Sequence, residues 1–271
     1  MNDRFEFGEN WKSFLRNVDE SHIEEAIADV RDVYDIEHME NSRFLDIGCG
    51  SGMFSLAAHR LGAAEVVSLD YDEQAVECCR QLRDEEEEVG NWSVTQGDIL
   101  DEDFVRSLGD FDYVYCWGVA HHTGDLWKAV DNTVTTVAER GQLCLGIYNR
   151  VEEGVYDSHT ALKIKRLYNW LPDPLRKLMV YGYAGAHLSL RTVLKREDPI
   201  KYVNSYGDDN RGMDYWHDVK DWLGWLPFEF ASPEEVEDYF DTNHPSFDHR
   251  KTIVRGNRPE TVNVYVFRNS P

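Results

Sequence analysis

The chain has 271 residues, which is enough for one large domain with a buried core. Its 51 acidic residues outnumber the 28 Lys and Arg residues, so the formal net charge is −23 at pH 7. A negative field of this strength disfavours nucleic acid as a partner. Few of the bases are lysine, and an acidic, lysine-poor surface is typical of a salt-rich cytoplasm that screens self-repulsion, which predicts a halophilic source.

The five cysteines are odd in number and lack C-x-x-C spacing, so they indicate neither a disulfide framework nor a zinc site. The segment from Met1 to Trp11 is charged and has no apolar core, unlike a signal peptide. The sequence also lacks the long apolar run that a membrane-spanning helix needs. We therefore expect a cytoplasmic protein without a metal.

The first part of the chain shows the periodicity of an α/β fold. Apolar residues at helical spacing from Ile23 to Tyr34 predict an amphipathic helix within an N-terminal helical cap, residues 1–40. A core over residues 41–150 follows, in which strands alternate with helices. The expected strands are 43–47, 66–70, 92–96, 112–117 and 142–148. This alternation predicts a doubly wound, mostly parallel sheet.

Residues 151–226 break this rhythm and are expected to form a basic helical insertion after the fifth strand. From Thr160 to Lys201 there are nine bases and three acids, a local charge of +6 that leaves −29 on the rest of the chain. Ile164, Leu167, Tyr168 and Leu171 predict one apolar helix face, with Lys163, Lys165 and Arg166 off it. Such a basic amphipathic helix is suited to an anionic membrane surface or an anionic substrate; the alternative is a lid that packs on the core.

The last segment, residues 227–271, is expected to complete the sheet. Ser232 and Pro233 have the residue types of a helix N-cap and first turn, which predicts a helix from Ser232 to Asp241. Two strand-like runs, Thr252 to Arg255 and Val262 to Phe267, are separated by Gly256-Asn257-Arg258-Pro259. They predict a β-hairpin.

The most informative motif is Arg43-Phe44-Leu45-Asp46-Ile47-Gly48-Cys49-Gly50-Ser51-Gly52, a short apolar strand that runs into alternating glycines. Glycine is needed where a strand turns into a helix so tightly that a Cβ would meet a bound nucleoside. A second strand ends about twenty residues later in Asp70, the spacing at which a carboxylate meets ribose hydroxyls. The loop lacks the Lys-Ser/Thr of a P-loop, so a nucleoside without phosphates fits better.

Four segments in this order resemble class I S-adenosylmethionine (SAM) methyltransferases: Asp46–Gly52, Leu69–Asp72, Gln96–Ile99 and Phe111–Gly124. The resemblance implies a seven-stranded sheet closed by an antiparallel hairpin, and SAM as cofactor. It implies that the methionine side of SAM meets Asp46, Gly48, Cys49, Gly50 and Gly52. It also implies that Asp70 accepts from the ribose hydroxyls, that Tyr71, Asp98 and Ile99 surround the adenine, and that Trp117 contacts the cofactor.

The whole chain also resembles a methyltransferase subgroup often encoded among sugar and surface-glycan genes, including haloarchaeal enzymes that act on lipid-linked oligosaccharides. The shared stretches are Phe7–Leu15, Lys165–Pro172, Arg211–Asp218, Asp221–Glu229 and Asn263–Phe267. Two departures, Gly224-Trp225 in place of Gly-Gly and the loop Gly256–Thr261, are expected near the acceptor pocket.

Candidate catalytic residues follow the fourth strand. His121 or His122 is placed to take a proton from a hydroxyl acceptor, or else only caps the loop. His217, Asp218 and Asp221 are weaker candidates. Tryptophans that would stack on a sugar are Trp11, Trp117, Trp216, Trp222 and Trp225.

The acceptor type decides whether a base is needed at all. A sugar hydroxyl requires one, whereas the carboxylate of a hexuronic acid in protein N-glycosylation requires only positioning by Lys or Arg. The predicted function is therefore O-methylation of a sugar of a glycan or lipid-linked oligosaccharide, with peripheral membrane contact through the insertion. The methyl ester of a hexuronic acid is the sharpest expectation, because the basic insertion suits a carboxylate acceptor. The alternatives are a quinone-like or other small acceptor, or a non-catalytic SAM-binding regulator.

Overall fold

The computed structural model describes residues 19–86, 88–153, 156–206, 215–256 and 258–270. Its centre is one seven-stranded sheet in the order β3-β2-β1-β4-β5-β7-β6. The strands are β1 (Arg43–Ile47), β2 (Glu65–Asp70), β3 (Trp92–Gln96), β4 (Phe111–Trp117), β5 (Val137–Tyr148), β6 (Phe247–Ile253) and β7 (Val262–Asn269). The first five pair in parallel, and β7 is antiparallel to both of its neighbours. The predicted doubly wound fold and its terminal hairpin are confirmed, but β6 runs from Phe247 to Ile253 rather than from Thr252 to Arg255.

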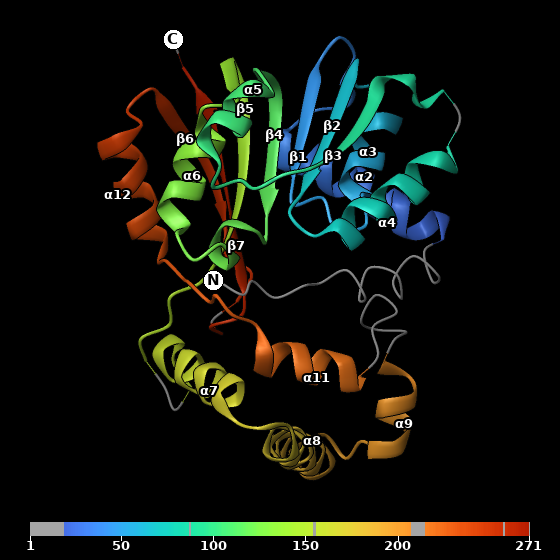
Figure 1. Cartoon of the computed structure of the whole chain (residues 1–271), viewed down its shortest axis with the longest axis vertical. Helices are drawn as coiled ribbons and strands as arrows, with labels where there is room; N and C mark the ends of the chain where they lie inside the picture. Colours follow the sequence, from blue (N-terminus) through green and yellow to red (C-terminus); the bar gives the residue numbers. More distant parts are fainter. Residues whose placement is uncertain (1–18, 87, 154–155, 207–214, 257, 271) are drawn as a thin grey trace.

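Helices cover both faces of this sheet, as Figure 1 shows. One face packs against α2 (Glu20–Tyr34), α3 (Met53–Arg60) and α4 (Glu73–Asp84). The other packs against α5 (Glu102–Ser107), α6 (Leu126–Val134) and α12 (Pro233–Asn243). Strands enclosed in this way are apolar on both sides, and β1 and β2 are accordingly almost continuous runs of buried residues.

Helix ends follow the local sequence signals. Ser232 accepts a hydrogen bond from the Glu235 amide, and the Glu235 side chain accepts one from the Ser232 amide, so the predicted cap of α12 is confirmed as a capping box. The same arrangement starts α2, where Asp19 accepts from the Ser21 and His22 amides. These caps supply partners for amides that the first helical turn leaves unpaired.

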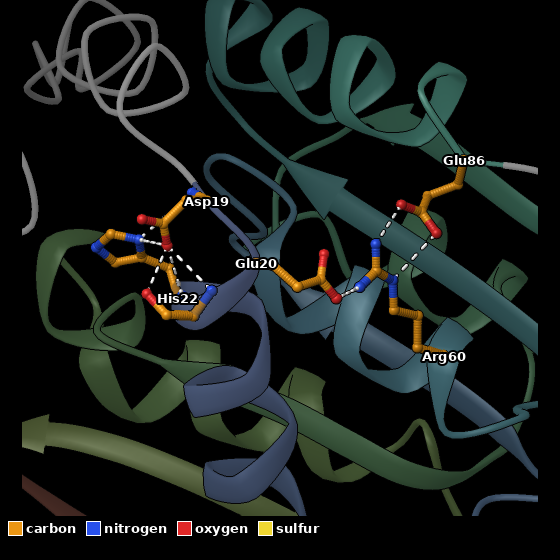
Figure 2. A network of polar contacts seen from close by, with 6 residues as sticks. Asp19, Glu20, His22, Arg60 and Glu86 are labelled. Carbon is orange, nitrogen blue, oxygen red and sulfur yellow. Dashed lines mark hydrogen bonds and ion pairs between the residues drawn. The ribbon is translucent and has the colours of Figure 1, made fainter.

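An ion-pair network fixes the start of α2 onto α3 (Figure 2). The Arg60 guanidinium donates to both carboxylate oxygens of Glu86, at 3.1 and 2.7 Å, and also to Glu20 in the first turn of α2. This pairing lowers the pKa of Glu86 and raises that of Arg60. The network matters for the site because α2 forms one of its walls.

The insertion forms a helical layer beyond one end of the sheet, with α8 and α9 farthest from it in Figure 1. Its helices are α7 (Ser158–Trp170), α8 (Asp173–Lys195), α9 (Pro199–Asn204) and α11 (Tyr215–Gly224). They enclose a small core of their own, which includes Val180, Ala184, Tyr206, Tyr215, Val219 and Leu223. Among the described residues, no helix is long and apolar enough to cross a membrane.

The expected apolar face of α7 is confirmed for Ile164 and Tyr168, which pack on the core of the insertion, but it is wrong for Leu167 and Lys165. Lys165 is 1% exposed and lies on the packed row with Ser158 and Ala161, whereas Leu167 is 49% exposed. The Lys165 amine donates to the Trp222 carbonyl and lies 4.9–5.5 Å from three aromatic ring centres. Periodicity alone placed Lys165 on the polar face of the helix, because a lysine is counted as polar in a sequence pattern. Its carbonyl partner and aromatic neighbours, which make burial possible, come from other segments.

Candidate active site

A cavity of about 550 Å³ opens at the carboxyl ends of β1, β2 and β4 and is also lined by residues of α2 and of the insertion. Its walls come from distant parts of the chain: α2, the β1–α3 turn, the ends of β2, β4 and β5, the loop after β3, the end of α11 and the loop before β7. In an open α/β sheet, this edge is where ligands bind. The cavity is therefore the candidate active site.

The glycine turn forms the floor of the cavity, and Gly48, Gly50 and Gly52 all have positive φ, at 71°, 53° and 86°. A Cβ on Gly48 would lie 2.1 Å from a methyl carbon of Val119, and one on Gly52 would lie 2.6 Å from the Cys79 sulfur. The expectation that these glycines leave room for a nucleoside is therefore too narrow. At Gly48 and Gly52, glycine is required by the backbone angle and by close packing of protein on protein.

Asp46 is the last but one residue of β1, beside this turn, and is 2% exposed. It accepts a hydrogen bond from Ser55 at 2.6 Å, Ser55 lies 2.6 Å from Ser68, and Ser68 accepts from the Trp92 indole at 2.8 Å. An indole N–H only donates and a carboxylate only accepts. The hydrogen bonds therefore run in one direction: Trp92 donates to Ser68, Ser68 to Ser55, and Ser55 to Asp46. Burial disfavours the charged form of Asp46 and raises its pKa to about 7, so a cationic ligand bound beside it would favour the ionised carboxylate.

Asp70 ends β2 and organises the turn from the other side. One of its oxygens accepts from the Gly50 amide and the other from the Asp72 amide, both at 2.9 Å. Each carboxylate oxygen can accept more than one hydrogen bond, so Asp70 keeps capacity for ligand hydroxyls. Burial raises its pKa to about 6, against the lowering effect of these amides.

The other expected adenine contacts divide into two groups. Tyr71, which is 51% exposed, and Ile99 line the cavity. Asp98 is not among the described lining residues, and its carboxylate accepts from the Leu100 amide at 2.8 Å. A Cβ on Gly97, which does line the cavity, would meet the Phe104 ring at 2.2 Å. The structure therefore brings Tyr71 and Ile99 to the cavity and gives Asp98 a turn contact.

The structure separates the two candidate bases. His121 is fully buried, its ring packs 3.8 Å from that of Tyr148, and its Nδ1 accepts from the Tyr148 amide. His122 lines the cavity, and its Nδ1 lies 2.9 Å from the Pro227 carbonyl oxygen. Burial lowers the pKa of His122 to about 4 and that of His121 well below its usual range, so both rings are neutral at pH 7. Only His122 lies where an acceptor can meet it.

Aromatic rings line the half of the cavity nearest the insertion. Tyr148 and Trp225 are nearly parallel, with ring centres 6.4 Å apart, and Trp117 and Trp222 also line the cavity. Trp216 packs on the core of the insertion instead, and Trp11 lies outside the described residues. Among the weaker catalytic candidates, Asp218 accepts from the Tyr206 hydroxyl, while the side chains of His217 and Asp221 lie outside the described part.

Carboxylates dominate the charge of the cavity wall. The acids that line it are Glu25, Asp29, Asp46, Asp70, Asp72 and Glu260. No Lys or Arg is present among the lining residues in the described part of the chain. Such a wall suits a cationic ligand, because opposite charges attract more strongly where water is partly excluded.

Sequence reasoning missed three features of this site. Glu25 and Asp29 of α2 reach the cavity, although the helix pattern shows only that they face away from the apolar stripe. Glu260 lies in the loop where the sequence departs from the subgroup pattern, and its partner there is the Tyr156 hydroxyl. The expectation that this loop and Gly224-Trp225 lie near the pocket is confirmed, since Glu260 and Trp225 both line the cavity. The departure in the loop was thus the available signal for Glu260.

The comparisons with known proteins agree with this geometry. Residues 38–180 match the family model described as "Methyltransferase domain". Ribosomal protein L11 methyltransferase of Thermotoga petrophila is 35% identical over 88 residues, 28% of this chain and 33% of that protein. Ubiquinone biosynthesis O-methyltransferase of Coxiella burnetii is 24% identical over 134 residues, 49% of this chain and 54% of that protein. The matches thus cover about a third to a half of these relatives.

Solved structures share the fold. Magnesium protoporphyrin IX methyltransferase from Synechocystis, solved with bound SAH, has a TM-score of 0.56 at 14% identity and covers 97% of this chain and 96% of its own. The YcgJ protein of Bacillus subtilis has a TM-score of 0.52 at 15% identity and covers 92% and 99%. At these identities, the likeness concerns the fold.

The family match spans more than half of the chain, so the chain belongs to the methyltransferase domain family. The fold and the cavity agree with this membership, and SAM is the cofactor expected of such a domain. The site fits that cofactor: Asp70 has oxygens for ribose hydroxyls, and the carboxylates of the wall offset a sulfonium charge.

Proposed function

We propose that the protein is an O-methyltransferase whose acceptor is a neutral hydroxyl on a sugar or a ring of similar size. The observation that carries this proposal is the acceptor half of the cavity, where His122 packs with the rings of Tyr148 and Trp225 and no Lys or Arg is among the described lining residues. When bound, the cofactor supplies a methyl group already activated as a sulfonium. The chain must then hold the acceptor oxygen in line and remove its proton.

His122 is the residue proposed to take that proton. A carbonyl oxygen only accepts, so the 2.9 Å contact with Pro227 places the ring proton of neutral His122 on Nδ1 and the lone pair on Nε2. A hydroxyl oxygen that gains a methyl group becomes strongly acidic, so even a base of low pKa accepts its proton. The Pro227 contact also fixes the ring orientation, as the third group does in a catalytic triad.

The lining favours a hydroxyl over the hexuronic acid carboxylate that the basic insertion suggested. A carboxylate acceptor needs a cation, and the described wall offers acids instead. Lys165 is nearby, but it is buried behind Trp222 and Trp225 and donates to a backbone carbonyl. The bases Lys163, Arg166, Lys177 and Lys195 are exposed on the outside of the insertion.

A sugar of a glycan or lipid-linked oligosaccharide remains the leading acceptor in this proposal. Support comes from the aromatic walls, since flat rings pack against the apolar faces of sugars, and from the carboxylate of Glu260, which accepts from hydroxyls. A quinone-like ring is the second candidate. The nearly parallel Tyr148 and Trp225 rings favour a planar acceptor, and a relative named for ubiquinone biosynthesis is an O-methyltransferase.

The test is transfer of isotope-labelled methyl from SAM to fractionated acceptors: nucleotide sugars, lipid-linked sugars and quinols. The proposal expects labelled product in a hydroxyl-bearing fraction, with transfer reduced about 10²- to 10⁴-fold in His122→Gln while SAM binding is kept. His121→Gln, which changes a ring outside the cavity, is the matched comparison. Transfer that is unaffected in His122→Gln would contradict the role of His122, and SAM binding without any transfer would favour a regulator.

A further inference from the structure

The long helix of the insertion exposes an apolar stripe. Helix α8 is 23 residues long, and positions three and four apart along it are exposed and uncharged. Leu178 is 66% exposed and Val193 is 75% exposed, and Leu190 and Leu194 extend the stripe at its end. The stripe consists of Leu175, Leu178, Gly182, Gly185, Ser189 and Val193.

Charged residues of α8 are confined to its ends. From Leu178 to Leu190 there is no Asp, Glu, Lys or Arg, a length of about 20 Å at 1.5 Å per residue. Trp170, at the end of α7 just before α8, is 80% exposed. Exposed bases lie near both ends of α8 and on the neighbouring helices α7 and α9: Lys163, Arg166, Lys177, Lys195, Arg196 and Lys201. An apolar stripe with a tryptophan and flanking bases is the composition of a helix that lies in a membrane interface.

Such a surface could be covered by a second copy of the chain or by a lipid membrane, and charge decides between these two occupants. The segment from Thr160 to Lys201 carries +6, so pairing it with the same segment of a second copy would bring two positive surfaces together. An anionic lipid surface instead attracts the bases and accepts the apolar stripe. The remainder of the chain carries −29 and is repelled by that surface, which favours docking through the insertion alone.

We propose that α8 and its flanking bases dock this enzyme onto an anionic lipid surface, with the helix axis in the plane of the membrane. Figure 1 shows α8 at the end of the molecule farthest from the sheet, so docking keeps the acidic core away from the lipid. The cavity then lies between the sheet and the membrane-facing layer, with Trp222 and Trp225 of that layer in its wall.

Vesicle co-sedimentation of the full chain tests this inference independently of catalysis. The probes are vesicles of phosphatidylcholine alone and of phosphatidylcholine mixed with phosphatidylglycerol. We expect binding to the anionic vesicles that is at least about tenfold tighter and weakens with salt. Each base near such a surface contributes about fivefold in affinity, so Lys177→Glu with Lys195→Glu lowers binding at least about tenfold.

Matched variants separate docking from misfolding. Leu178→Asp with Val193→Asp is expected to abolish binding, whereas Val254→Asp, at an exposed apolar residue outside the insertion, leaves it unchanged. SAM affinity by calorimetry confirms that each variant is folded, since the cavity is not altered. Equal sedimentation of wild type and the Leu178/Val193 variant overturns the proposal. The proposal is also overturned if the wild type is a dimer in analytical ultracentrifugation and the Leu178/Val193 variant is a monomer, because a second copy then covers the stripe.

Discussion

The raised pKa values of Asp46 and Asp70 predict that SAM affinity depends steeply on pH. Burial raises the pKa of Asp70 to about 6 and that of Asp46 to about 7, and both residues line the cavity. A bound sulfonium and ribose hydroxyls favour the ionised carboxylates. SAM should therefore bind better as the pH rises from 5 to 8, and binding near pH 6 should release protons.

The magnitude follows from the ionised fractions. At pH 5, an acid with a pKa of about 6 is roughly one-tenth ionised, so Asp70 alone weakens SAM binding about tenfold relative to pH 8. Asp46 adds up to about a further hundredfold where its charge also contributes to binding. One pKa unit corresponds to about 1.4 kcal/mol, so the combined change in binding free energy is about 1.4 to 4 kcal/mol.

Isothermal titration calorimetry between pH 5 and 8, in two buffers of different ionisation enthalpy, measures both the affinity and the protons released. Asp70→Asn should bind weakly and lose the part of the pH dependence centred near pH 6. Asp84→Asn, at an exposed carboxylate of α4 outside the cavity, should behave like wild type. A dissociation constant that stays flat from pH 5 to 8, or an unchanged slope in Asp70→Asn, refutes this electrostatic reasoning.

Four further outcomes are expected. Gly48→Ala should lose SAM binding and about 2 kcal/mol or more of stability in urea unfolding, because its Cβ would meet Val119. In the Val119→Ala background, part of the binding and part of the stability should return. If neither returns, the packing argument is contradicted. Burial lowers the pKa of Lys165 from 10.5 to about 8, so the unfolded chain binds more protons than the folded chain between these pH values. The free energy of unfolding of the wild type should therefore rise by up to about 3 kcal/mol from pH 8 to 10.5. Urea unfolding curves of Lys165→Met should lack this rise. Arg60→Ala should cost about 1 kcal/mol, and a thermal melt that matches wild type would show that the network contributes nothing to stability. Screening of the −23 charge should raise the melting temperature between low and molar KCl, and a flat profile contradicts the halophilic expectation.

Much of the fold was predictable because its signals are local. Alternating apolar runs locate the strands, and Ser232 with Pro233 locates the start of α12. The carboxyl ends of parallel strands meet at one edge, so Asp46 and Asp70 were expected together before the cavity was known.

What the sequence did not reveal depends on contacts between distant segments. The packing of Gly48 on Val119 joins residues 71 positions apart, and no local pattern encodes it. Adjacent histidines look equivalent in sequence, yet His121 packs on Tyr148 while His122 faces the cavity. Lys165 looked like a solvated base because the aromatic rings around it come from the other end of the insertion.

The most direct test of the central claim is the chemical bond in the methylated product. The enzyme would be incubated with SAM carrying a deuterated methyl group and the accepting fraction, and the product analysed by mass spectrometry before and after mild alkali. We expect an alkali-stable methyl ether whose formation is lost in His122→Gln and kept in His121→Gln. An alkali-labile methyl ester, formed equally well by both variants, would contradict it.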